Sequence, residues 1–347
     1  MKKFAAVIGY GGMGGWHTRH MLDSDVCALA GIYDINPQKN ALAEERGIHA
    51  YASEAELLAD PRIEFVTIAT PNDVHEPIAI RAMEAGKSVI CEKPVTLSME
   101  SLERMIAAAQ KNHVLFSVHQ NRRWDQDFLG MKRIVESGNI GEIVNIESRI
   151  HGSRGIPSDW RALKPYGGGM LYDWGVHLID QVLCIFGFDN IKSVRCDFEH
   201  ITTQEVDDGF HLTIFFHDGK QAYIEVQTLN FVAMPRFYLR CKKGTAIIRD
   251  WQKPAEIVKC KAWHESEVIP VQTAAGLTKT MAPRDSVTID KYEQPIPASD
   301  VHEYYRNFVK AMDGKETQLV THDQIRTVLK VIMTAFESAE KGETINW

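Results

Sequence analysis

The stretch FAAVIGYGGMG, residues 4–14, decides the fold of the first part of the chain. Its apolar residues 4–8 form a short run of the kind that fills a buried strand of a parallel sheet. Glycines then follow at positions 9, 11 and 14, in the spacing GxGxxG. This spacing means little by itself in a chain with 24 glycines. A strand before it and a helix after it, however, favour a dinucleotide-binding turn.

The three glycines of this spacing have different roles in such a turn. Gly9 allows the tight turn, Gly11 lets the backbone approach a pyrophosphate, and Gly14 lets the helix pack closely on the sheet. The N–H groups at the start of the helix then face the anion. The expected cofactor loop consists of Gly9, Tyr10, Gly11, Gly12, Met13 and Gly14.

Asp34 ends the second expected strand, residues 27–34, and lies 20 residues beyond Gly14. An acidic side chain at this place accepts hydrogen bonds from the ribose hydroxyls of the adenosine half and repels a 2′-phosphate. No Arg or Ser follows Asp34 to receive such a phosphate, so we expect NAD rather than NADP. The alternative is an ordinary turn residue ahead of Asn36-Pro37, which begins a helix.

Strands and helices alternate through the first third of the chain, which predicts a parallel sheet with helices on both faces. The expected strands are residues 4–10, 27–34, 65–70, 88–92 and 114–119.

The pattern changes after residue 122. A helix at 126–137, a strand at 142–150 and a helix at about 170–186 precede a series of strands between 191 and 271. Within this series, His217-Asp218-Gly219 indicates a hairpin turn. Residues 273–300 contain prolines and few periodic apolar residues, so we expect a surface excursion, followed by closing helices at 301–313 and 322–341.

These patterns predict an α/β Rossmann domain over residues 1–121. An α+β domain over residues 122–347 follows, with a large, open, mostly antiparallel sheet. We leave open whether helix 322–341 packs back on the first domain. A sheet of this kind needs its exposed face covered, which favours a homodimer or homotetramer.

Composition narrows the class of protein further. The net charge of −7 argues against a general nucleic-acid surface or an acidic-membrane surface. No apolar run approaches the ~18–20 residues that span a bilayer. None of the six cysteines is part of a CxxC pair, which is typical of reduced thiols in a cytoplasmic protein. No His or Cys cluster has the spacing of metal ligands, so we expect no bound metal.

Lys93 follows the fourth expected strand within the sequence CEKP, residues 91–94. The carboxyl ends of strands in an open parallel sheet face the ligand crevice. Most surface lysines are merely solvated, but Lys93 stands between a buried strand and a rigid proline, and this favours a role in function.

The sequence GGGMLYDWGVHLID, residues 167–180, places Asp173 and His177 four residues apart in an apolar segment. A helix would bring both side chains to one face. A packing helix with two hydrogen-bonded polar residues is one interpretation, and a catalytic pair is the other. In the catalytic interpretation, residues 167–169 have no side chains because substrate and nicotinamide need the space.

Taken together, these motifs resemble those of the glucose-fructose oxidoreductase / myo-inositol dehydrogenase / rhizopine catabolism (Gfo/Idh/MocA) family. The matching motifs are GYGGMG, ATPNDVH (69–75), AGKSVICEKP (85–94), HQNRRW (119–124), DWR (159–161) and GGGMLYDWGVHLID. The resemblance covers residues 1–190 and the closing FESAEKGETI, but 273–300 has no counterpart that we can align.

The resemblance implies NAD(P)-dependent oxidation of a secondary alcohol on a sugar, inositol or related polyol. Its implied catalytic group is Lys93, Asp173 and His177. The residues expected at the cofactor, besides the loop, Asp34 and Lys93, are Thr70, Asn72, His75, Glu92 and Asn121. The residues expected at the substrate, besides the catalytic group, are Asn121, Trp160, Arg161 and Tyr166.

The expected chemistry agrees with these residue types. A neutral imidazole such as His177 takes the hydroxyl proton near pH 7, and a cationic Lys93 stabilises developing alkoxide charge. Asp173 either orients the imidazole or binds a substrate hydroxyl.

Two other functions remain open for this set of motifs. The first is a redox-neutral, NAD-dependent glycosidase or eliminase of the same family. The second is a cofactor-sensing regulator without catalysis, which would have no need for Lys93, Asp173 and His177 together.

Overall fold

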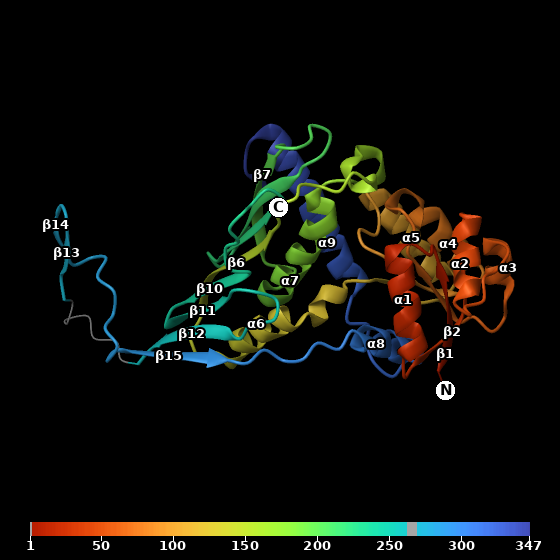
Figure 1. The fold of residues 1–347 in the computed structure, drawn as a ribbon, viewed down its shortest axis with the longest axis horizontal. Helices are drawn as coiled ribbons and strands as arrows, with labels where there is room; N and C mark the ends of the chain where they lie inside the picture. Colours follow the sequence, from red (N-terminus) through yellow and green to blue (C-terminus); the bar gives the residue numbers. More distant parts are fainter. Residues whose placement is uncertain (1, 262–268) are drawn as a thin grey trace.

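The computed structural model describes residues 2–261 and 269–347. These residues form two domains side by side, each with its own apolar core, and Figure 1 shows the first domain at the right and the second at its left. Residues 262–268, within the region expected to form strands, lie outside the described part of the chain.

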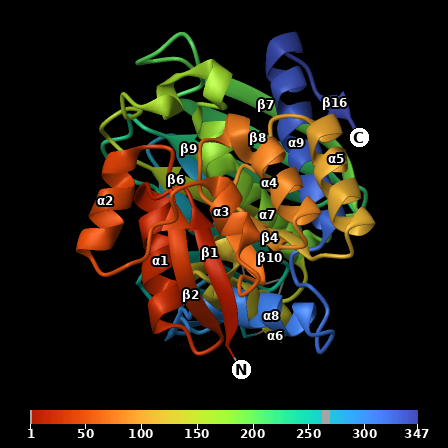
Figure 2. The same cartoon turned by 90° about the vertical axis from the view of Figure 1, so that its right-hand side faces the viewer.

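The first domain contains a five-stranded parallel sheet in the order β2-β1-β3-β4-β5. Its strands are β1 (Lys3–Ile8), β2 (Cys27–Tyr33), β3 (Phe65–Ile68), β4 (Ser88–Cys91) and β5 (Phe116–Val118). Its helices are α1 (Gly12–Asp23), α2 (Pro37–Glu45), α3 (Glu54–Ala59), α4 (His75–Glu84) and α5 (Met99–Lys111). The predicted Rossmann-type fold is therefore confirmed, and Figure 2 shows its helices packed around the sheet.

Local sequence signals account for the helix boundaries in this domain. The Asn36 side chain caps α2 by accepting from the backbone N–H of Gln38, and Ser98 caps α5 in the same way through Ser101. The six-residue helix α3, which the sequence pattern did not reveal, is capped by Ser53. It is too short for a helical period to emerge from its sequence.

The second domain contains a nine-stranded sheet in the order β15-β12-β11-β10-β6-β9-β8-β7-β16, with only β6 and β9 parallel among the pairs between these strands. Its first strands are β6 (Ile143–His151), β7 (Ile191–Glu199), β8 (Gly209–Phe216), β9 (Gln221–Gln227) and β10 (Phe237–Cys241). The others are β11 (Gly244–Ile248), β12 (Ala255–Cys260), β15 (Ile289–Gln294) and β16 (Ile345–Asn346). Helices α6 (Gln126–Ser137), α7 (Val176–Phe186) and α9 (His322–Lys341) pack on this sheet. The predicted large and mostly antiparallel sheet is confirmed.

The region 273–300 differs in part from the expected surface excursion. Strand β15 joins the sheet as an edge strand along β12. An edge strand has a neighbour on one side only, and β15 is mostly exposed, so it lacks the apolar alternation that marks an inner strand. The hairpin of β13 (Val271–Thr273) and β14 (Gly276–Thr278) does extend away from the body, at the far left of Figure 1.

The two closing helices connect the two cores. Helix α8 (His302–Met312) buries four apolar residues in the core of the first domain, namely Tyr304, Tyr305, Phe308 and Val309. Helix α9 contributes Ile325 and Leu329 to the first core, and Val331 and Ile332 to the second. We retain the boundary at 121–122 as a proposal for where the chain crosses between domains, although α8 packs with the first.

None of the helices in the described residues is both long enough and apolar enough to cross a membrane.

Candidate active site

The cofactor loop joins β1 to α1, and two of its glycines are required by close backbone contacts. Gly9 has φ of +92°, and a Cβ there would lie 2.7 Å from the carbonyl oxygen of Ala69. A Cβ on Gly14 would lie 1.8 Å from the carbonyl oxygen of Gly9. Gly9 therefore makes the turn and Gly14 permits close packing of α1 on the sheet, as the motif predicts.

The middle of the same loop faces open space. A Cβ on Gly11 or Gly12 would meet nothing within 4 Å. Gly11 is the N-cap of α1, and no side chain caps the first N–H groups of this 12-residue helix. Uncapped N–H groups beside an open glycine backbone suit a pyrophosphate, so the loop fits a dinucleotide.

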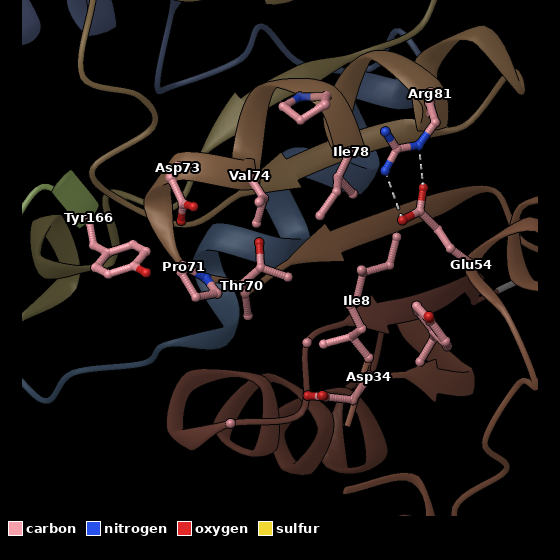
Figure 3. Close-up of a pocket in the computed structure, with 16 residues that line it drawn as sticks. Ile8, Asp34, Glu54, Thr70, Pro71, Asp73, Val74, Ile78, Arg81 and Tyr166 are labelled. Carbon is pink, nitrogen blue, oxygen red and sulfur yellow. Dashed lines mark hydrogen bonds and ion pairs between the residues drawn. The ribbon is translucent and has the colours of Figure 1, made fainter. Parts of the chain in front are cut away.

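A cleft of about 560 Å³ adjoins this loop. Figure 3 shows Asp34 beneath the cleft and Thr70, Pro71 and Asp73 on the opposite wall. Tyr166 of the second domain lies at one end of the cleft. The ion pair between Arg81 and Glu54, with an Nε–Oε1 distance of 2.7 Å, closes the other end. The cleft is therefore bounded by both domains.

The carboxylate of Asp34 lines the cleft and also holds the loop. One oxygen accepts from the backbone N–H of Tyr10 at 2.6 Å, and the other accepts from that of Asn36 at 2.8 Å. The turn role and the cofactor role are thus compatible, because each carboxylate oxygen has further lone pairs that ribose hydroxyls can use.

Two residues expected at the cofactor support the wall of the cleft from behind. His75 is fully buried, and its Nε2 and Nδ1 hydrogen-bond the carbonyl oxygens of Thr70 at 2.9 Å and Pro94 at 3.1 Å. Asn72 donates from Nδ2 to the carbonyl oxygen of Tyr166 at 2.9 Å. His75 connects the loops after β3 and β4, and Asn72 ties the first domain to the second.

Glu92 is also buried and is the centre of a polar cluster. Its Oε1 accepts from His17 Nε2 and from His119 Nδ1, at 2.8 Å each, and His17 Nδ1 hydrogen-bonds the hydroxyl of Tyr305. Burial alone would raise the pKa of Glu92, but His119 and His17 together lower it well below its usual value. Burial, together with His119, lowers the pKa of His17 to about 4. Glu92 is therefore a buried carboxylate, and His17 beside it is a neutral imidazole at pH 7.

The sequence did not reveal that this cluster has the composition of a metal site. The candidate donor atoms of His17, Glu92 and His119 all lie within 4.8 Å of one another. Both imidazoles hydrogen-bond the same carboxylate oxygen, and this accounts for the arrangement without an ion. The absence of a resident metal stays a prediction.

Lys93 and Asp173 are brought together across the domain boundary. The Nζ of Lys93 donates to a carboxylate oxygen and to the backbone carbonyl oxygen of Asp173, at 2.9 Å each. The second carboxylate oxygen accepts from Arg161 Nε at 3.1 Å. Burial alone would raise the pKa of Asp173, but Lys93 and Arg161 outweigh burial and hold this pKa below its usual value. Asp173 is therefore an anion between two cations.

His177 lies in the first turn of α7 and is 4% exposed. Its Nδ1 is buried without a hydrogen-bond partner in the described part of the chain. Burial, and then the charges of Lys93 and Arg122, lower its pKa well below the usual value. The imidazole is therefore neutral at pH 7. Because Asp173 bonds Lys93 and Arg161, its carboxylate does not orient this imidazole here.

The segment before α7 is a single π-helical turn, Leu171–Gly175, rather than the start of a regular α-helix. Such turns are frequent at functional sites. Asp207, which the sequence analysis did not single out, accepts from the backbone N–H of Leu171 at 2.8 Å. Burial raises the pKa of this carboxyl to about 8. Asp207 thereby fixes the beginning of the segment that carries Asp173 and His177.

The expectation that the triple glycine leaves space for substrate is wrong. A Cβ on Gly167 would lie 2.5 Å from Leu97, one on Gly168 2.4 Å from the carbonyl oxygen of Arg161, and one on Gly169 2.1 Å from Asp207. These glycines allow close approach of other parts of the chain, and Gly167 and Gly169 also have positive φ.

A second pocket of about 510 Å³ lies beside Asp173 and is lined by residues of the second domain. Arg161, Trp174 and Trp251 also line it. Two other residues expected at the substrate do not line this pocket. Tyr166 lines the cofactor cleft. Trp160 packs on Arg161, and the Cζ of Arg161 lies 4.5 Å from the ring centroid of Trp160. Asn121 begins a turn after β5, at the carboxyl edge of the sheet.

Two family models match the chain. A family model described as "Oxidoreductase family, NAD-binding Rossmann fold" matches residues 3–120. A second, "GFO/IDH/MocA C-terminal domain", matches residues 128–247. The two matches correspond to the two domains of the fold.

Among solved structures, an NAD-binding protein from Listeria innocua is 44% identical, with full coverage of both chains and a TM-score of 0.95. Among curated proteins, the scyllo-inositol 2-dehydrogenase (NADP(+)) IolW of Bacillus subtilis is 31% identical, over 84% of this chain and 80% of its own length. An uncharacterized oxidoreductase of Schizosaccharomyces pombe, C115.03, is 37% identical over 52% of this chain. The chain spans about half the length of that relative, since the match covers 50% of it.

Proposed function

Because the chain belongs to the GFO/IDH/MocA family of oxidoreductases and has an NAD-binding Rossmann domain, we propose that it transfers a hydride between NAD(H) and a small carbohydrate. The reacting group is a secondary hydroxyl, or the corresponding ketone, of a sugar, an inositol or a related polyol. The observation that supports this most directly is the contact between Lys93, in the cofactor domain, and Asp173, in the wall of the second pocket.

The cofactor, when bound, supplies a nicotinamide that accepts or returns the hydride. Lys93 is a cation fixed by two hydrogen bonds to Asp173, and it stabilises negative charge on the reacting oxygen. His177 is neutral at pH 7, so it can accept the hydroxyl proton in oxidation, and its protonated form can return the proton in reduction. Asp173 holds Lys93 and Arg161 in position.

We infer that NAD is preferred over NADP. The carboxylate of Asp34 lines the cleft next to the glycine loop, where it can accept from two ribose hydroxyls and would repel a 2′-phosphate. The scyllo-inositol 2-dehydrogenase of Bacillus subtilis is named for NADP(+), so we expect the two proteins to differ in the ratio of kcat/KM for NAD and NADP.

We also propose an inositol, or a sugar of similar ring shape, as the substrate, because that relative acts on scyllo-inositol. We propose a cytoplasmic location, which is supported by the free thiols of Cys27, Cys91, Cys184, Cys196 and Cys241. A homodimer or homotetramer through the second-domain sheet is the proposed assembly, since helices cover one face of that sheet.

The direct test is a screen for NAD reduction with inositols, monosaccharides, glycosides and sugar acids. The proposal predicts that NADH accumulates with at least one free polyol or sugar. Cleavage of a glycoside without net NADH would support the redox-neutral alternative instead. Binding of NADH and a sugar without any turnover would favour a regulator.

A further inference from the structure

Two tryptophans from separate segments meet in the wall of the second pocket. Trp174 lies in the π-turn next to Asp173, and Trp251 lies in the turn between β11 and β12. Their ring centroids are 5.8 Å apart with an angle of 46° between the planes, and both residues line the pocket. The Trp174 ring centroid is 6.2 Å from that of His177. The aromatic surface therefore lies beside the proposed site of proton transfer.

Arginine side chains that do not line the pocket contact both indoles. The guanidinium carbon of Arg122 lies 4.2 Å from the ring centroid of Trp174 and 5.4 Å from that of Trp251. Arg236 is 4% exposed and lies 5.2 Å from Trp251. Trp174 and Trp251 line the pocket, and Arg122 and Arg236 do not. The cations therefore stabilise the ring positions and leave indole surface facing the pocket.

The backbone at Trp251 is fixed as well. Gln126 Nε2 donates to the carbonyl oxygen of Trp251 at 2.9 Å, which ties this turn to α6. Arg236 is in turn anchored by Asp127, with an Nε–Oδ2 distance of 3.0 Å, and by Ser148 and Gln181. An aromatic surface supported in this way loses little conformational freedom when a ligand binds.

We propose that Trp174 and Trp251 form a stacking platform for one C–H face of a six-membered polyol ring, a proposal that rests on the proposed function. Such a ring presents three axial C–H groups on any face without an axial hydroxyl, and this face is apolar and weakly positive. The face of an indole is electron-rich, so the two surfaces attract each other. The polar groups of Asp173 and Arg161 in the same pocket then face the equatorial hydroxyls.

The platform implies a stereochemical preference. Scyllo-inositol has no axial hydroxyl and myo-inositol has one, so each has at least one face of axial C–H groups. Neo-inositol has two axial hydroxyls that point to opposite faces, so neither face is free. An acyclic hexitol has no fixed face. The enzyme should therefore bind the first two ligands more tightly than the last two.

Binding is tested by calorimetric titration of the full chain saturated with NADH, so that no ligand is turned over. The ligands are scyllo-, myo- and neo-inositol and sorbitol. The proteins are wild type, Trp251→Leu, Trp251→Phe and Trp347→Leu. Trp347 packs on Lys330 at the carboxyl end of the chain, outside the pocket wall, and is the matched control.

We expect Trp251→Leu to weaken scyllo- and myo-inositol binding by about tenfold, and Trp251→Phe to restore most of it. Trp347→Leu should bind as wild type does, and affinities for neo-inositol and sorbitol should be low and unaffected by Trp251→Leu. Equal wild-type affinity for all four ligands, absence of inositol binding, or unchanged affinity in Trp251→Leu would each overturn the platform.

The same titration separates the two proposals. If the protein oxidises an inositol and Trp251→Leu binds it with unchanged affinity, the stacking platform is disproved and the proposed function stands. If inositols bind selectively and this binding depends on Trp251, but no NAD is reduced, the proposed function is disproved and the stacking platform stands.

Discussion

The ammonium group of Lys93 lies 2.9 Å from both the carboxylate and the backbone carbonyl oxygen of Asp173. Lys93 follows β4 of the first domain, and Asp173 lies in the turn before α7 of the second. The position of the cation thus depends on how the two domains pack. The proposed catalytic group is complete only where the cofactor domain and the pocket domain meet.

Lys93→Ala should lower kcat by about 10²–10⁴-fold, because a fixed cation at the reacting oxygen contributes to the transition state rather than to cofactor binding. NADH affinity, measured by fluorescence titration, should change little. The control is Lys132→Ala on α6, which removes a half-exposed lysine that pairs with Glu136 on the same helix. Near wild-type turnover in Lys93→Ala would exclude the assigned role.

His177 gives a prediction for the pH dependence of oxidation. Its pKa lies well below 6.5 because the side chain is buried beside Lys93, so the imidazole stays neutral as the pH falls through 6.5. The kcat/KM for polyol oxidation should therefore fall with acid only below this pH. His177→Asn should reduce turnover by several orders of magnitude and remove that acidic limb. An acidic limb centred at 6.5 or higher in wild type would contradict the assignment.

Asp34→Ala should weaken NAD binding and reduce the preference for NAD over NADP. The change removes an acceptor for ribose hydroxyls and a negative charge that repels a 2′-phosphate. It also removes the hydrogen bond that positions the Tyr10 N–H, so some loss is expected for both cofactors. The ratio of kcat/KM for NAD to kcat/KM for NADP separates the effect on cofactor discrimination from this general loss. An unchanged ratio would exclude Asp34 from cofactor discrimination.

Asp207 gives a prediction for stability. Burial raises its folded-state pKa to about 8, against ~3.9 in an unfolded chain, so the folded protein retains a proton that the unfolded chain loses. This contribution to the free energy of unfolding is present at low pH. It is lost by about 1.4 kcal/mol per pH unit as the pH rises from 4 towards 8.

Asp207→Asn retains an acceptor for the Leu171 N–H and removes the titration. Urea unfolding between pH 6 and 8.5 should show that the variant gains stability relative to wild type as the pH rises. Asp208→Asn is the neighbouring control, because the Asp208 pKa is lowered and does not titrate in this range. If the difference in free energy of unfolding between Asp207→Asn and wild type stayed constant over this pH range, the raised pKa of Asp207 would be disproved.

Short-range signals were sufficient to predict the five strands of the first sheet, the hairpin of β8 and β9, and the cofactor loop. Gly9 and Gly14 have the backbone contacts that the motif requires, and the Asp-Gly turn at Asp218 joins β8 to β9. These features depend on neighbouring residues, so they are visible in sequence. The family resemblance grouped Lys93 with Asp173, and the structure brings the two side chains into contact although 80 residues separate them.

Contacts between distant segments were not predictable in this way. His17, Glu92 and His119 lie on separate elements, and no spacing in the sequence links them. Trp251 lies in a turn that has no motif, and only the packing of the second domain brings it beside Trp174. The glycines at 167–169 look like cleared space in sequence, because the atoms that fill this space, such as those of Asp207, come from elsewhere in the chain.

The most direct test of the central claim follows the hydride itself. Scyllo- and myo-inositol deuterated at every ring carbon are incubated with NAD and the wild-type protein, and the nicotinamide product is analysed by mass spectrometry. We expect net NADH to form with one deuterium per molecule, and Lys93→Ala and His177→Asn to form almost none. Absence of deuterium transfer to the cofactor from either inositol, in a protein that binds both ligands, would contradict the central claim.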